Sequence, residues 1–113
     1  TIVEKFAKET DGITRLTVHT MDDRGNSTVL ASTDGTKIGK PSDKEDLTAM
    51  TTGQTVTLEE AGALDITVPA VKKGTGFQYA VGVTLKAAPG ADRKPLVQKA
   101  QDVALQIGKA LGG

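Results

Sequence analysis

The sequence contains no cysteine and no tryptophan, and its one histidine is His19. Without cysteine the chain forms neither a disulfide scaffold nor a thiolate zinc site, and it has no cysteine nucleophile. A single imidazole excludes metal sites of the H-E-x-x-H type, which need two. Aromatic residues make up only 3% of the chain, which is little for a surface that stacks nucleic-acid bases or for a large aromatic-lined pocket.

The chain also lacks an excess of charge of either sign and a long apolar run. Its 14 basic and 14 acidic residues cancel. A general nucleic-acid-binding domain carries a basic excess, so we expect no nucleic-acid partner. No stretch approaches the roughly 18 apolar residues of a membrane-spanning helix, so we expect no membrane span. What remains is a chain of 113 residues with 37% hydrophobic residues, which suits one domain with an ordinary core.

The periodicity of the sequence predicts an α+β domain over residues 1–113, with helices at both ends and five antiparallel strands that form one sheet. The predicted helices cover residues 2–9, 42–52 and 93–111, and the predicted strands cover residues 13–21, 27–33, 55–60, 64–71 and 77–86. The last helix follows a linker with Pro89 and has one apolar stripe. That stripe contains Leu96, Ala100, Val103, Ile107 and Leu111.

Two details of this pattern predict local structure. Ser42 and Glu45 have the spacing of a capping box, so we expect Ser42 to begin the short middle helix. Pro69 has no backbone N–H to donate, so it indicates a strand end or an edge position in the sheet.

Three segments of the chain resemble Cache sensor domains in their single-unit form, which is built on a PAS-like sheet. Residues 29–42 resemble the second strand of that family and the loop after it, and residues 46–54 resemble the short helix that ends in a threonine-glycine turn. Residues 64–71 and 77–85 resemble the last two strands, and the similarity extends over about residues 2–87. Cache domains are extracytoplasmic modules of bacterial receptors, and they bind small molecules between the sheet and the segment that joins the second and third strands. The resemblance therefore implies a ligand site under residues 34–54.

Several residues are candidates for that site, and each has a structural alternative. Arg15 and His19 lie on the polar face of a predicted strand, where they could hold a carboxylate. The alternative is a solvated strand face on which Arg15 pairs with Asp65. Asp34 could bond a ligand or its own turn. The complete expected set of ligand-binding residues is Arg15, His19, Asp34, Thr67 and Tyr79.

Four apolar residues are expected to line the pocket, namely Ile38, Leu47, Met50 and Phe77, although all four also fit a core that needs no ligand. Tyr79 shares its strand face with Phe77 and equally fits core packing. A lone histidine has no ligand partners at recognisable spacing, so we expect no metal and no cofactor.

The sequence carries no enzyme signature, because its serines lack a G-x-S-x-G context. We therefore expect a periplasmic or secreted sensor-like domain that binds a small molecule, such as a carboxylate, without covalent chemistry. The alternative is a structural or interaction module with a filled pocket that forms a homodimer through its terminal helices.

Overall fold

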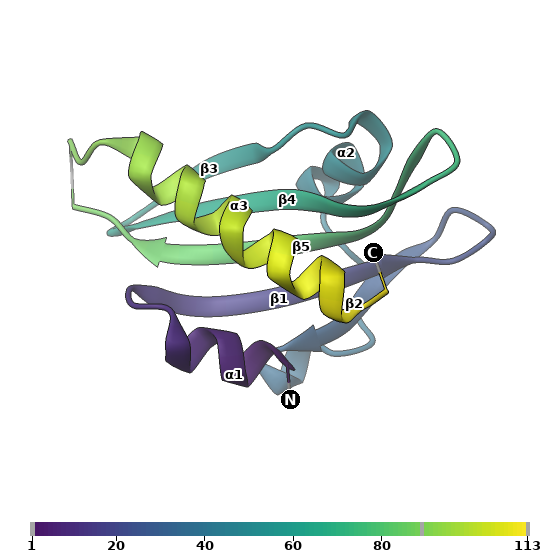
Figure 1. Cartoon of the computed structure of the whole chain (residues 1–113), viewed down its shortest axis with the longest axis horizontal. Coiled ribbons are helices and arrows are strands. Elements are labelled where there is room, and N and C mark those ends of the chain that lie inside the picture. Colours follow the sequence, from purple (N-terminus) through teal and green to yellow (C-terminus); the bar gives the residue numbers. More distant parts are fainter. Residues whose placement is uncertain (1, 89, 113) are drawn as a thin grey trace.

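The computed structural model describes residues 2–88 and 90–112, so the predictions that concern Thr1, Pro89 and Gly113 lie outside the described residues. Five antiparallel strands form one sheet in the order β2-β1-β5-β4-β3, with helices on both of its faces (Figure 1). The strands are β1 (Ile13–Met21), β2 (Ser27–Ser32), β3 (Val56–Glu60), β4 (Ala63–Lys73) and β5 (Gly76–Lys86). The helices are α1 (Ile2–Glu9), the 3-10 turn η1 (Gly35–Lys37), α2 (Lys44–Thr52) and α3 (Arg93–Ala110). The predicted fold class is confirmed.

The two faces of the sheet carry different helices. In Figure 1, α1 and α3 lie in front of the sheet, and α2 lies behind it. The face under α1 and α3 holds the apolar core, to which β1 contributes Leu16 and Val18 and α3 contributes Val103 and Ile107. The predicted stripe of α3 therefore faces the sheet, as an amphipathic helix requires. None of the described helices is long and apolar enough to cross a membrane.

The start of α2 differs from the prediction by one residue. Asp43, not Ser42, is the N-cap, and its backbone N–H donates to Asp46 Oδ2 at 3.0 Å. The sequence offers the capping-box spacing twice in succession, as Ser42 with Glu45 and as Asp43 with Asp46. The second pair is used because the hydroxyl of Ser42 bonds to the sheet instead.

The predicted position of Pro69 is confirmed in a local sense. β4 lies inside the sheet, between β5 and β3, but its pairing with β3 ends at Thr67. Pro69 lies beyond that point and is paired only with Ala80 of β5. One side of β4 is therefore an edge at Pro69, and the missing N–H removes no ladder bond to β3.

Candidate functional site

A cavity of about 200 Å³ lies between the sheet and the segment of residues 34–54, which we call the cover. Its floor comes from β1, β2, β4 and β5 and contains Arg15, Thr17, His19, Val29, Asp65, Gly82 and Thr84. The cover supplies Lys37, Lys40, Pro41, Asp43, Glu45 and Asp46. The cavity therefore lies where the resemblance implies a ligand site.

The strand register arranges the floor in rows across the sheet. Thr84 of β5 pairs with both Arg15 and Asp65, so these three residues form one row. In the next row Gly82 pairs with Thr17 on one side and with Thr67 on the other. A Cβ atom at Gly82 would lie 3.9 Å from His19 Nε2, which is ordinary contact. Alanine would therefore fit there. Because glycine has no side chain, Gly82 leaves space in the middle of the floor.

His19 connects the floor to the cover through a buried network. Its Nδ1 lies 2.8 Å from the Ser42 hydroxyl, which lies 2.6 Å from the Ser27 hydroxyl. Its Nε2 lies 3.3 Å from Asp46 Oδ1, and the two side chains are only 10% and 6% exposed. Thr67 of β4 also donates to Asp46 Oδ1, at 3.5 Å. One imidazole thus links β1 and β2 with both the loop and the helix of the cover.

Burial disfavours the charged form of each member of the His19–Asp46 pair. Burial lowers the pKa of His19 to about 4, and Lys37 acts in the same direction against the opposing effect of Asp43. Burial raises the pKa of Asp46 to about 7, and the neighbouring carboxylates Glu45, Asp43 and Asp65 raise it further. The bond from the Asp43 backbone N–H opposes this rise. Between these two values the pair holds one proton, which belongs to both groups.

The connectivity of Ser42, His19 and Asp46 is that of a serine, a base and an orienting acid. Ser42 is not among the residues that line the cavity, and its hydroxyl contacts both Ser27 and His19. The hydroxyl is thus held between Ser27 of β2 and His19 of β1. The arrangement fits a tether between sheet and cover.

Three cationic side chains line the cavity, from Arg15, Lys37 and Lys40. Among residues 2–88 and 90–112, no ion pair within 4.0 Å joins any of the three to a carboxylate. The alternative in which Arg15 pairs with Asp65 is therefore not formed. Asp65 accepts a bond of 3.4 Å from the Thr84 hydroxyl, and its pKa is raised by burial and by Glu60, while Arg15 opposes the rise.

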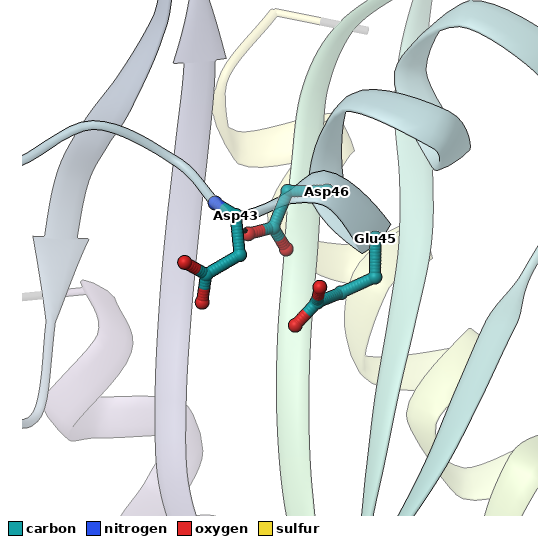
Figure 2. Close-up of side chains that lie close together, drawn as sticks. All are labelled: Asp43, Glu45 and Asp46. Atoms are coloured by element: carbon teal, nitrogen blue, oxygen red, sulfur yellow. Dashed lines mark hydrogen bonds between the residues drawn. The ribbon is translucent and has the colours of Figure 1, made fainter.

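Figure 2 shows three carboxylates at the start of α2, from Asp43, Glu45 and Asp46. One oxygen from each lies within 4.8 Å of the others. Both oxygens of Asp46 already have contacts within the protein, to the Asp43 backbone N–H on one side and to His19 and Thr67 on the other. Nothing further in this cluster points to a cation, so we do not assign it as a metal site.

The structure brings some of the predicted ligand-binding residues to the cavity and not others. Arg15 and His19 line it, and Thr67 contacts it only through Asp46. Asp34 lies outside the lining, because its Oδ1 accepts from the backbone and hydroxyl of Thr36 and caps η1. These two bonds also lower the pKa of Asp34.

Tyr79 lies on the opposite side of the sheet, so its expected place in the ligand site is wrong. Strand residues alternate between faces, and Tyr79 shares the face of Val81 and Val83. It packs against the apolar core under α1 and α3. The cavity is on the other side of β5, where Gly82 and Thr84 point.

None of the four expected apolar lining residues lines the cavity. Ile38 is 53% exposed, and Leu47 is half-buried. Met50 is fully buried, and Phe77 lies against Gly53 at the end of α2. The lining that the cavity does have is mostly polar or charged, with Val29, Pro41 and Gly82 as the exceptions.

Sequence reasoning missed most of the charged lining. Asp65 and Thr84 have the same strand parity as Thr67 and Gly82, so the alternation that placed Arg15 and His19 on one face carried this signal too. Lys37, Lys40 and the acids of α2 lie in a turn and a helix start, where no two-residue period exists. The sequence carried no comparable signal for them.

No protein-family model matches this chain, and no curated protein matches it significantly. Among solved structures, the chain is similar to the GAF domain of the Acinetobacter phosphoenolpyruvate-protein phosphotransferase, with a TM-score of 0.59 and 16% sequence identity. The match covers 99% of this chain and 82% of that one. At this identity the similarity shows the fold alone. The chain thus has a GAF/PAS-like fold, in agreement with the PAS-like sheet expected from the sequence.

Proposed function

We propose that this chain is a sensor-like domain of the Cache type that binds a small carboxylate between the sheet and the cover. One observation carries the proposal: Arg15, Lys37 and Lys40 line a partly open cavity without an ion-pair partner within 4.0 Å in the described chain. A guanidinium that faces a cavity is suited to bidentate binding of a carboxylate.

The size and charge of the cavity restrict which ligands fit. A volume of about 200 Å³ suits a molecule of a few heavy atoms, since one liquid water occupies roughly 30 Å³. Asp43, Glu45 and Asp65 also line the space, and they repel a ligand with two negative charges more strongly than a ligand with one. We therefore favour a monocarboxylate with a hydroxyl or other donor group that the acids can accept from.

The mechanism that we propose is non-covalent. The cover contributes two of the three cations, Lys37 and Lys40, and the Asp46 contact to His19, so a bound anion favours the cover position seen here over others. A periplasmic or secreted location is part of the proposal, and the resemblance to Cache domains supports it. No cofactor enters this mechanism.

The test is a thermal-shift screen of the whole chain against short carboxylates, including acetate, lactate, pyruvate and succinate. A ligand that binds only the native state raises the melting temperature, by an amount that grows with concentration. We expect the monocarboxylates to raise the melting temperature. We expect Arg15→Gln to weaken their binding at least tenfold. Arg24→Gln is the matched control, because Arg24 is exposed in the β1–β2 turn away from the cavity. A panel in which no compound raises the melting temperature overturns the proposal.

A second candidate function is an interaction module that forms a homodimer, and a groove beside α3 favours it. The groove has a volume of about 730 Å³ and is lined by apolar residues that include Val71, Phe77 and Ala104. Leu105 is 60% exposed at its rim. Sedimentation over a range of concentrations tests this function, and a strictly monomeric chain speaks against it.

A further inference from the structure

We propose that anion binding in the cavity is coupled to protons through the His19–Asp46 pair. The pair takes up one proton as the pH falls from alkaline to mildly acidic, and the cavity then holds a small anion more tightly. This inference concerns the regulation of the site described above, and it rests on the proposed function.

The position of the pair is the first argument. His19 comes from the floor and Asp46 from the cover, and both line the cavity. Their side chains are 10% and 6% exposed, with 3.3 Å between Nε2 and Oδ1. A proton added here therefore changes the charge of the cavity wall itself, where the solvent screens it little.

The charges that face the pair are the second argument. β1 contributes Arg15, the loop of the cover contributes Lys37 and Lys40, α2 contributes Asp43 and Glu45 beside Asp46, and β4 contributes Asp65. The lining residues from β5, Gly82 and Thr84, carry no charge. With Asp46 ionised and His19 neutral, the four lining acids outnumber the three lining bases, Arg15, Lys37 and Lys40. One added proton makes the two numbers equal, so the excess negative charge that repels an anion is removed.

The hydrogen bonds of the tether survive this step. Asp46 Oδ2 still accepts from the Asp43 backbone N–H, and the proton lies between Oδ1 and Nε2. Nδ1 keeps its contact with Ser42, which is bonded to Ser27. Burial raises the pKa of Asp46 to about 7, which puts the uptake near neutral pH. Because one unit charge lies a few ångströms from the ligand, we expect roughly a tenfold change in affinity.

The first arm of the test needs no ligand. His19 is the only histidine, so its imidazole signals in an NMR pH titration need no assignment. We expect two steps in the wild type, near pH 7 and near pH 4, and a single step below the ordinary histidine range in Asp46→Asn. Glu45→Gln, which changes a neighbouring lining carboxylate, keeps both steps. One ordinary step near 6.5 in the wild type, or two steps that Asp46→Asn leaves unchanged, overturns the proposal.

A carboxyl-carbon NMR titration of the wild type is the second measurement, since Asp46→Asn can also weaken the fold. One aspartate with a midpoint near pH 7 is expected, and the absence of such a signal overturns the proposal.

The second arm uses acetate as the probe, which is ionised at both pH 6 and pH 8. We expect it to bind roughly ten times more tightly at pH 6 in the wild type, and equally at both pH values in Asp46→Asn. Equal wild-type affinity at the two pH values overturns the coupling and leaves the proposed function standing. No acetate binding at either pH overturns the anion site, and the coupling with it.

Discussion

The two faces of the sheet use the same strands for opposite purposes. Under α1 and α3, side chains such as Leu16, Ile66 and Val83 are fully buried against one another. Under the cover, Arg15, His19 and Thr84 of the same strands surround a cavity. The alternation of strand side chains separates the two environments across the thickness of one sheet.

The two faces contribute differently to the stability of the fold. Apolar burial is the main stabilising contribution, so the face under α3 holds the fold together. The face under the cover combines the burial of Ala49 and Met50 with hydrogen bonds, each of which adds only about 1 kcal/mol net. Among the described residues, no buried side-chain nitrogen or oxygen lacks a partner. The polar face can therefore keep a hollow without a large cost to the fold.

The largest expected effect is on stability and comes from a substitution in the apolar core under α3. Ile107 of α3 is fully buried, and Ile107→Ala is expected to lower the free energy of unfolding by about 3–4 kcal/mol, because it leaves a cavity. Urea denaturation measures this change. Leu105→Ala is the control on the same helix. Since Leu105 is 60% exposed, its loss is expected to change stability by less than about 0.5 kcal/mol.

The next effect concerns the pH dependence of stability. It distinguishes the contribution of His19 from that of Asp46. The pKa of His19 falls from 6.5 to about 4 on folding, so this group alone makes stability rise with pH across that interval. The pKa of Asp46 rises from 3.8 to about 7, so this group alone makes stability fall with pH across its interval. In the wild type the two contributions nearly cancel between about pH 4 and pH 6.5.

When either His19 or Asp46 is replaced, the pH dependence of stability should show the contribution of the residue that remains. Relative to the wild type, the free energy of unfolding of Asp46→Asn is expected to rise by roughly 2–3 kcal/mol between pH 4 and pH 6.5. The free energy of unfolding of His19→Gln is expected to fall by a similar amount, relative to the wild type, as the pH rises to 7. Urea denaturation at several pH values gives both difference curves. Two curves with the same sign of slope would show that the pair does not share a proton.

The smallest effect tests how closely α3 packs on the sheet. A Cβ atom at Gly108 would lie 3.5 Å from Ala70 Cβ and 3.7 Å from Val71 Cγ2, which is ordinary contact. Gly108→Ala is therefore expected to raise the free energy of unfolding by roughly 0.5–1 kcal/mol, through higher helix propensity. Gly76→Ala on the cover side should destabilise the fold, because its Cβ would lie 2.8 Å from the Met50 backbone oxygen. A loss of stability in Gly108→Ala would contradict the contact distances.

Much of the fold was predictable from the sequence, because strands and amphipathic helices have short periods. The alternation around Leu16 and Val18 identified the core face of β1, and the same rule put Arg15 and His19 on the other. The rule also assigned Tyr79 to the core face, and its proposed ligand role contradicted that assignment. The start of α2 was harder, because two overlapping capping boxes compete and the winner depends on what Ser42 contacts in the sheet.

The sequence by itself determined the five-stranded sheet, its apolar and polar faces, and the absence of cysteine chemistry and of a strong net charge. Those features follow from side-chain types and from backbone periodicity, which act over a few residues. Only the tertiary structure decided that Asp46 faces His19 and that Lys37 and Lys40 face Arg15. Their positions depend on the path of the cover loop, which is held by long-range contacts such as the bridge from Pro41 to Thr28 and the bond from the Ser42 N–H to the Ser27 carbonyl.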